Sequence, residues 1–229
     1  MKITHEIVGK GYPLVLIHGN GENHHIFDRL VEKLQNQFQC ILVDYHFQNK
    51  EELTYEHMCD ALLEVLHHLS FNEYDVIGFS DGAIIGLLMA MKDQHMKHLV
   101  SIGANTEPQA LKPLYYYSMY LRMFCLLPFC LYNPHAKKQW HMTKLMLKHP
   151  HITQTQLESI SIPVLVMAGE MDMIKQDNSE FIAKSLPYGL LKIIPHANHF
   201  LLSDAFQKTS HEIMLFLKAC HKDDHDECL

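Results

Sequence analysis

The sequence predicts an α/β protein with a mostly parallel central sheet flanked by helices. Short apolar runs rich in β-branched residues alternate with longer segments whose apolar residues recur at helical spacing. The apolar runs are continuous rather than alternating, which is typical of parallel strands covered on both faces. The chain has 229 residues, and 48% of them are hydrophobic. This is enough for one domain with a sizeable core, and it argues against disorder.

The predicted strands are spread along the whole chain. The segment 2–8 is expected to form an additional strand at its start. Six short apolar runs follow, in which side chains suited to a buried sheet are frequent. These runs are 14–17, 40–43, 75–78, 99–102, 164–168 and 190–194.

Helices are predicted in the intervals between these strands. Phe27, Leu30 and Leu34, for example, recur at the spacing that places side chains on one face of a helix. A small-residue, apolar segment directly after the third apolar run is also expected to be helical. The predicted helices are 26–37, 54–69, 81–91 and 206–218.

One interval breaks the alternation. About 55 residues lie between the run that ends near Gly103 and the run that begins at Val164, and aromatic residues and methionines are frequent among them. A loop of that length inside a compact domain is rarely structureless. We therefore expect 107–158 to be a small helical insertion that forms a cap, or lid, on a single domain spanning 1–229.

The charge of the chain does not favour a nucleic-acid partner. There are 19 Lys and Arg against 26 Asp and Glu, which gives a formal net charge of −7 with all 19 histidines neutral. No dense cluster of Lys and Arg is present to neutralise phosphates. Because histidine titrates near neutrality, the net charge is a steep function of pH.

The sequence also favours a cytoplasmic protein without a membrane span. Its first residues lack the apolar stretch of a signal peptide. The longest lipid-like stretch, 119–132, contains Arg122 and Pro128 and is shorter than the ~20 residues that cross a bilayer. None of the six cysteines forms a C-x-x-C pair, so we expect reduced thiols. These features leave the oligomeric state open.

The motif Gly78-Phe79-Ser80-Asp81-Gly82 carries the strongest chemical signal. It matches G-x-S-x-G, follows a predicted strand directly and precedes a predicted small-residue helix. That context is typical of a nucleophile elbow, in which glycines permit a sharp turn that exposes the serine hydroxyl. The helix that follows would aim its N-terminus at a developing oxyanion. The alternative is an incidental glycine turn.

A second glycine-rich turn, His18-Gly19-Asn20-Gly21, follows the strand predicted at 14–17. Such a turn can present a backbone N–H group towards the serine. We therefore expect the backbone N–H groups of Asn20 and Asp81 to form an oxyanion hole. A plain connection between a strand and a helix is the simpler alternative.

An acid and a base are predicted after the last two strands. Asp172 follows the run 164–168, with Glu170 and Asp177 as alternatives. His199 follows the run 190–194, with His196 as the alternative, and His199 is favoured because it lies nearer the helix that would fix it. The order Ser80, Asp172, His199 is the order expected of α/β-hydrolases.

Together these motifs resemble the α/β-hydrolase fold over nearly the whole chain. The resemblance rests on H-G-N-G, G-F-S-D-G, G-E-M-D, H-A-N-H-F and the segment 102–105. It implies that Ser80 is the nucleophile, His199 the base and Asp172 the acid that orients it, with no cofactor. One segment departs from the pattern: Asp44-Tyr45-His46-Phe47 stands where many members have an R-G-x-G-type loop.

The substrate pocket and the remaining histidines give weaker signals. An apolar substrate pocket is expected against the insertion, because Met and aromatic side chains suit adaptable pockets, although they also suit a core. No metal site is predicted, because the pairs His24/His25, His67/His68, His95/His98 and His221/His225 lack a convincing tetrahedral set. The residues expected to line the pocket are His24, Phe79, Tyr116, Tyr120 and Phe124.

The interpretation favoured by these residues is a serine hydrolase for carboxylic esters of small or medium apolar groups, with a small-molecule substrate. Thioesters, lactones, carbon–carbon bonds and cofactor-free perhydrolysis would use the same three side chains. A different class of function, a ligand-binding regulator on a hydrolase scaffold, is the alternative. Fold analogy supports the reaction class and says nothing of the substrate.

Overall fold

A seven-stranded, mostly parallel sheet forms the centre of the molecule. The computed structural model describes residues 1–46 and 53–222, and its strands lie in the order β1-β3-β2-β4-β5-β6-β7. Strand β1 is antiparallel to β3, and every other pair is parallel. This arrangement confirms the predicted fold class. The strands are β1 (Lys2–Gly9), β2 (Tyr12–Ile17), β3 (Phe38–His46), β4 (Tyr74–Phe79), β5 (Met96–Ile102), β6 (Val164–Gly169) and β7 (Gly189–Ile194).

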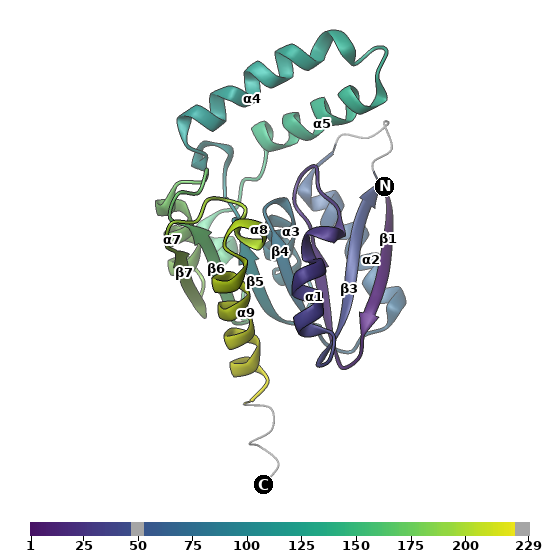
Figure 1. Cartoon of the computed structure of the whole chain (residues 1–229), viewed down its shortest axis with the longest axis vertical. Helices are drawn as coiled ribbons and strands as arrows, with labels where there is room; N and C mark the ends of the chain where they lie inside the picture. The colour runs from purple at the N-terminus through teal and green to yellow at the C-terminus, as the bar shows by residue number, and fades with distance from the viewer. Residues whose placement is uncertain (47–52, 223–229) are drawn as a thin grey trace.

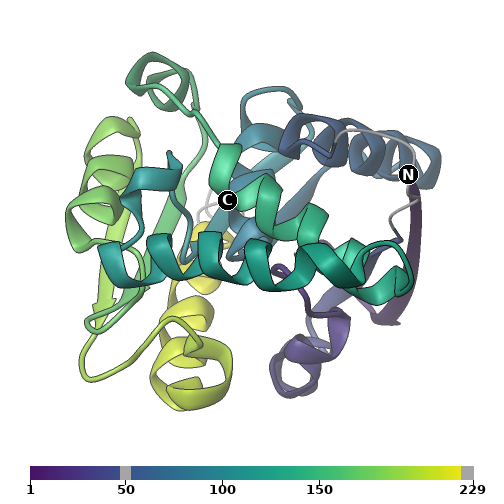
Figure 2. The ribbon, with the colours of Figure 1, turned by 90° about the horizontal axis from the view of Figure 1, so that it is seen from above.

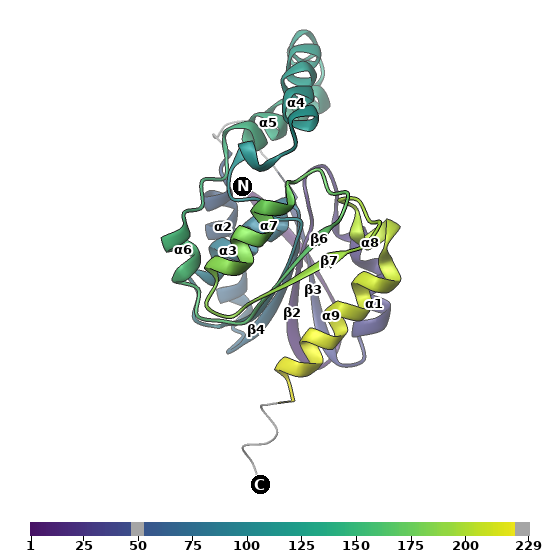
Figure 3. The ribbon, with the colours of Figure 1, turned by 90° about the vertical axis from the view of Figure 1, so that its left-hand side faces the viewer.

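Helices cover both faces of the sheet and form two hydrophobic cores (Figure 3). On one face the strands pack against α2 (Tyr55–Leu69), α3 (Asp81–Ala90) and α7 (Gln176–Ser185). On the other they pack against α1 (Asp28–Leu34) and α9 (Phe206–Cys220). Burial on both sides explains why the central strands read as continuous apolar runs.

Several local features depart from the sequence predictions. The helix predicted at 26–37 is a 3₁₀ turn (His24–Phe27) followed by α1, and it ends early because the carbonyl groups of Gln35 and Gln37 accept hydrogen bonds from the β1–β2 turn. Strand β7 lies at the edge of the sheet, so its side chains alternate in exposure rather than being buried throughout. Helix α7 was not predicted, because its sequence is mostly polar.

Between β5 and β6 the chain forms a helical hairpin, which we call the cap. It consists of α4 (Pro113–Leu126) and α5 (Pro134–Lys148), joined by the 3₁₀ turn Leu127–Phe129. The two helices contact each other and lie across the carboxyl ends of the strands (Figures 1 and 2). The turn Pro108–Ala110 precedes the hairpin, and the short helix α6 (Gln154–Glu158) follows it.

Local sequence explains where the cap helices begin. Pro113 is in the first turn of α4, where its missing N–H group costs no hydrogen bond. The side chain of Asn133 accepts hydrogen bonds from the N–H groups of His135 and Ala136 at the start of α5. None of the helices in the described ranges combines the length and the apolar character that a membrane span requires.

Candidate active site

Ser80 lies on a sharp turn between β4 and α3. Its φ of 53° and ψ of −117° are unusual for a residue with a side chain, and its N–H donates to the carbonyl of Ile102 at 2.7 Å. A Cβ atom at Gly78 would lie 2.3 Å from the carbonyl oxygen of Gly82, and one at Gly82 would lie 2.0 Å from that of Ile17. Only glycine fits at these two positions, which is the physical reason for the G-x-S-x-G spacing. The turn holds strain of the kind found at functional sites.

Ser80, His199 and Asp172 form a chain of hydrogen bonds at the carboxyl ends of β4, β7 and β6. The Oγ of Ser80 lies 3.0 Å from Nε2 of His199, and Nδ1 of His199 lies 2.8 Å from Oδ1 of Asp172. Asp172 is held by the N–H of Ile174, which donates to Oδ1 at 2.9 Å. His199 and Asp172 are 5% and 1% exposed. With its Nδ1–H donated to Asp172, His199 presents Nε2 to the serine proton.

The alternative acids and the alternative base lie elsewhere. His196 is exposed, and its N–H donates to the side chain of Glu170 at 2.8 Å. Asp177 is in the first turn of α7 and lines a different cavity. The structure therefore does not bring His196, Glu170 or Asp177 to Ser80.

Gly103, directly after β5, limits the space available to the ring of His199. Its φ is +67°, and a Cβ atom there would lie 2.7 Å from Cε1 of His199. The rings of Phe79 and Phe200 lie 5.2 Å and 5.7 Å from the imidazole, centroid to centroid. No local pattern in the sequence indicates this role of Gly103, because the contact joins residues far apart in the chain.

The glycine turn after β2 lies close to Ser80. A Cβ atom at Gly19 would lie 2.9 Å from Cβ of Ser80, and Asn20 lines the same cavity as Ser80. Asp81 is the first residue of α3, where backbone N–H groups have no partner within a helix. Asn20 and Asp81 therefore both lie beside Ser80, and the assignment of their backbone N–H groups to an oxyanion hole stays a prediction.

Two further carboxyl groups lie beside the serine, and no motif in the sequence indicates them. Burial raises the pKa of Asp81 from 3.8 to about 6, and the hydroxyl of Tyr55 donates to its Oδ1 at 2.9 Å. Burial also raises the pKa of Glu22. Within the described part of the chain, Oδ2 of Asp81 and Oε2 of Glu22 are buried without a hydrogen-bond partner. Burial disfavours the charged form, so both groups keep their proton to a higher pH than a free carboxyl group does.

The cavity beside Ser80 has a volume of about 270 Å³. Helix α4 contributes Tyr115, Ser118, Met119 and Arg122 to its wall, and α5 contributes Thr143 and Met146. The remaining lining residues come from the loops around the triad: Asn20, Glu22, Phe79, Ser80, Met173, His199 and Phe200.

Of the five side chains predicted to line this cavity, Phe79 does so and four do not. Tyr116 and Tyr120 lie on a face of α4 next to the lining face, and Phe124 lies on the opposite side of the helix. The hydroxyls of Tyr116 and Tyr120 are 3.2 Å apart, and Phe124 is 75% exposed. The prediction chose the wrong stripe because aromatic residues occur all round this helix.

His24 is the other misplaced pocket residue. Its Nδ1 lies 2.5 Å from Oδ2 of Asp44, and its backbone N–H donates to Oδ1 of the same residue at 2.9 Å. Asp44, in the segment that departs from the family pattern, thus holds the start of the 3₁₀ turn. Phe47, at the end of that segment, lies outside the described residues.

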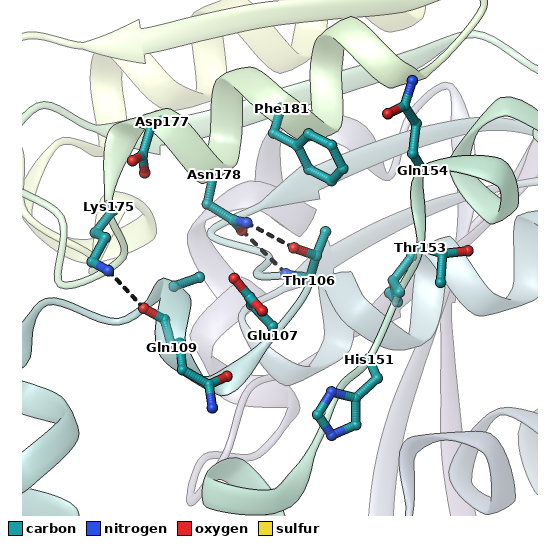
Figure 4. A pocket seen from close by; sticks show the side chains of 12 residues that line it. Thr106, Glu107, Gln109, His151, Thr153, Gln154, Lys175, Asp177, Asn178 and Phe181 are labelled. Carbon is teal, nitrogen blue, oxygen red and sulfur yellow. Dashed lines mark hydrogen bonds between the residues drawn. The ribbon is translucent and has the colours of Figure 1, made fainter.

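A larger cavity of about 520 Å³ lies away from the triad, between α7 and the segments that join the cap to the sheet (Figure 4). In its wall, the side chain of Asn178 donates to Oγ1 of Thr106 at 2.7 Å, and Lys175 donates to the carbonyl of Gln109 at 2.8 Å. Its lining is largely polar, and it contains none of the three triad residues.

One group of side chains could hold a metal ion by its geometry. In the described ranges, Asp75, His98 and His221 are the set whose possible ligand atoms all lie within 4.8 Å of one another. The two oxygens of Asp75 already bind Nδ1 of His98 at 2.7 Å and Nε2 of His221 at 2.8 Å. The group is at the opposite end of β4 from Ser80. His225, the other member of one predicted pair, lies outside the described residues.

The comparisons with known proteins agree with this architecture. A family model described as alpha/beta hydrolase fold matches residues 12–129. An esterase from Thermogutta terrifontis is 19% identical, with a TM-score of 0.76 over 96% of this chain and 94% of that one. An esterase from Exiguobacterium antarcticum is 20% identical, with a TM-score of 0.77 over 94% and 95%.

A third solved structure has the same fold. A carboxylesterase structure from Nitrososphaera gargenis is 18% identical, with a TM-score of 0.79 over 96% of both chains. No curated protein sequence matches the chain. At these identities, the likeness to solved structures concerns the fold.

Proposed function

Because this chain belongs to the alpha/beta hydrolase fold family, we propose that it is a serine hydrolase that cleaves carboxylic esters of small or medium apolar groups. The observation that carries the proposal is the hydrogen-bonded chain from Ser80 through His199 to Asp172. A serine hydroxyl is a weak nucleophile until a base within hydrogen-bond reach removes its proton. His199 lies within that reach at 3.0 Å.

The first half of the reaction forms an acyl-enzyme. Oγ of Ser80 attacks the ester carbonyl carbon while Nε2 of His199 takes the hydroxyl proton. Asp172 holds the imidazole in the required tautomer and stabilises the imidazolium. The carbonyl π electrons move onto oxygen, and the tetrahedral intermediate then collapses as His199 returns the proton to the leaving alcohol.

The second half regenerates the serine. A water molecule takes the place of the alcohol, gives a proton to His199 and attacks the acyl carbon. Collapse of this second intermediate transfers the proton to Oγ of Ser80 and releases a carboxylic acid. Ester and water are thereby converted into acid and alcohol, with no oxidant, metal or cofactor in the balance.

The negative charge of both intermediates would lie against the N–H groups of Asn20 and Asp81. Asp81 begins α3, so the partial positive charge of the helix N-terminus adds to its hydrogen bond. Removing one such donor typically raises a barrier by ~2.7–4 kcal/mol. These donors belong to the backbone and are fixed by the glycine turns on either side of Ser80.

The cavity supports the substrate class. At about 270 Å³ it is near the lower end of the ~300–1,000 Å³ range typical of ligand pockets. Phe79, Met119, Met146 and Met173 give it an adaptable apolar wall. Glu22, whose pKa is raised by burial, adds an acid that disfavours an anionic substrate group once it ionises.

The proposal is tested with p-nitrophenyl esters of graded acyl length, together with matched thioesters and lactones. We expect turnover of short and medium acyl esters, and Ser80→Ala should lower kcat by ~10⁴-fold or more. A fluorophosphonate should label wild type at Ser80 and leave the variant unlabelled. Absence of both cleavage and labelling would overturn the proposal in favour of a ligand-binding protein.

The two neighbouring histidines provide a matched control. His199→Ala should abolish turnover, because it removes the base, whereas His196→Ala should retain most of it, because His196 is exposed and contacts Glu170. The reverse outcome would contradict the assignment of the base. If thioesters were turned over much faster than esters, the proposed substrate would change from an ester to a thioester, and the proposed roles of Ser80, His199 and Asp172 would stay the same.

A further inference from the structure

Helix α4 has two different faces. Tyr115, Ser118, Met119 and Arg122 lie on the inner face and line the cavity beside Ser80. Leu114, Tyr117, Leu121 and Phe124 follow one another at intervals of three and four residues, which places them on one other stripe of the helix. We call this second set the outer stripe.

The outer stripe is apolar and open to solvent. Leu114 is 78% exposed, Tyr117 68%, Leu121 64% and Phe124 75%. None of the 14 described residues of α4 is buried. Helices of water-soluble domains ordinarily present charged or polar residues on their solvent face, so four large apolar side chains in a row indicate an unfilled contact surface.

The apolar surface continues around the end of the hairpin. The connection between α4 and α5 exposes four more large apolar side chains, of which Tyr132 is 87% exposed. Figure 1 shows this end of the cap projecting beyond the body of the molecule. We call these residues the hairpin tip: Leu127, Phe129, Leu131 and Tyr132.

The cap also has a charge opposite to that of the body. The cap, residues 113–148, contains five Lys and Arg and none of the 26 Asp and Glu of the chain. It is therefore cationic, whereas the rest of the chain carries 14 Lys and Arg against all 26 acidic residues. Arg122, Lys138 and Lys148 are exposed. Such segregation of charge favours an anionic partner on the side of the cap.

From these observations we propose that the cap docks on a lipid surface rich in anionic headgroups. The outer stripe and the hairpin tip enter the boundary between headgroups and acyl chains, and the lysines of the cap attract the headgroup phosphates. Pairing of two copies cap to cap is disfavoured, because two cationic caps repel each other. Tyrosine and phenylalanine also suit the interface between water and lipid.

Docking has a structural consequence for the cavity. The same helix that presents the outer stripe to lipid lines the cavity with its inner face. The bilayer surface would therefore lie one helix diameter from the residues beside Ser80. The docking does not depend on hydrolysis, and its test uses a chain without the nucleophile so that the two proposals fail separately.

The experiment is flotation of the full chain carrying Ser80→Ala with lipid vesicles at 0.1 M NaCl. Vesicles of phosphatidylcholine with 30% phosphatidylglycerol should bind at least ~10-fold more protein than vesicles of phosphatidylcholine alone. Raising NaCl to 0.5 M should weaken binding, because salt screens the attraction of the cap lysines to lipid. The emission of Trp140, the single tryptophan of the chain, reports on the surroundings of α5.

Two matched pairs of variants separate the apolar and the charged parts. Vesicle binding should fall at least ~10-fold in a triple variant of the outer stripe that carries Leu114→Ser, Leu121→Ser and Phe124→Ser. The control is a triple variant that removes similarly exposed apolar side chains outside the cap, and its vesicle binding should be unchanged. It carries Tyr188→Ser, Leu190→Ser and Leu215→Ser. Lys138→Glu with Lys148→Glu should weaken binding, and Lys184→Glu with Lys208→Glu should not. Circular dichroism checks that each variant is folded.

Three outcomes would overturn the proposal. The first is absence of flotation with either vesicle composition. The second is equal binding to neutral and anionic vesicles, which would remove the role of the cap charge. The third is a concentration-dependent dimer in analytical ultracentrifugation that the outer-stripe variant abolishes, without any flotation, because the surface would then be covered by a second copy.

Discussion

Two aspartate–histidine groups lie at opposite ends of the same sheet. At the carboxyl end, Asp172 binds His199, which reaches Ser80. At the amino end, Asp75 binds His98 and His221. Both aspartates are buried, at 1% and 0% exposure. An aspartate–histidine pair by itself is therefore not an active site.

The two groups differ in the conformation of the surrounding backbone and in whether the buried carboxyl oxygens nearby have hydrogen-bond partners. Beside Asp172 the chain holds Ser80 at a positive φ, and buried oxygens of Asp81 and Glu22 have no partner in the described part of the chain. At the other end, each oxygen of Asp75 has a histidine partner. The carboxyl end is thus the more strained and less fully hydrogen-bonded of the two, which under the proposed function is the cost of a reactive serine.

The largest expected effect is a loss of kcat that occurs when Asp172 is replaced but not when Asp75 is replaced. Asp172→Asn should lower kcat by ~10⁴-fold, because the imidazole loses the partner that fixes its tautomer. Asp75→Asn should leave kcat within about 2-fold, and instead lower the free energy of unfolding by ~1–3 kcal/mol through loss of hydrogen bonding. Steady-state kinetics and urea unfolding measure the two quantities. A large loss of kcat in Asp75→Asn would break the comparison.

An intermediate effect is expected from crowding the catalytic ring. Gly103→Ala places a methyl group 2.7 Å from Cε1 of His199 and should lower kcat by ~10²-fold, the cost of displacing a catalytic group by about 1 Å. Gly21→Ala is the matched control, because Gly21 also has a positive φ but its Cβ would meet no atom within 4 Å. Both variants should lose ~1 kcal/mol of stability. Equal kcat losses would show that backbone strain, rather than contact with the ring, is responsible.

The smallest expected effect concerns the pH dependence of stability. The folded-state pKa of Asp81 is raised by burial to about 6, above its ordinary 3.8. The contribution of the Asp81 carboxyl group to the free energy of unfolding is therefore fully present below pH 3.8, and it is lost as the pH rises through about 6. Asp81→Asn should match wild type at pH 4 and exceed its free energy of unfolding by roughly 2–3 kcal/mol at pH 8.

The control for this prediction is Asp75→Asn, whose two oxygens both have partners. It should lose stability rather than gain it at pH 8. Urea unfolding of the three proteins at pH 4 and pH 8 gives the comparison. A variant at Asp81 that is less stable than wild type at pH 8 would show that the ionised carboxylate is satisfied after all.

The sequence predicted the sheet well because burial on both faces leaves a local signal. Each central strand appears as a continuous run of apolar residues, and the elbow around Ser80 requires glycines at fixed spacing. Helix α7 gave little signal, because Phe181, Ile182 and Ala183 are its apolar residues and they adjoin one another. The sequence pattern therefore predicts the buried strands, whose own residues form apolar runs, and misses a helix such as α7, whose residues are mostly polar.

The features that the sequence did not reveal depend on residues far apart in the chain. His221 meets Asp75 across 146 positions, and no spacing rule connects them. The face of α4 that lines the cavity was also misjudged, because Tyr116 and Tyr120 are as aromatic as Tyr115. The raised pKa of Asp81 follows from burial, which appears only once the sheet and the helices are assembled.

Because Ser80, Asp172 and His199 lie far apart in the sequence, the reactivity of Ser80 reports whether the chain is folded. Its hydroxyl meets His199 at a separation of 119 positions, with the whole cap inserted between them. A hydroxyl group in an unfolded chain has no such neighbour and no heightened reactivity. Covalent capture of Ser80 would therefore count assembled molecules rather than total polypeptide, and it could follow the survival of native chains in a crude extract or during ageing of a stored sample.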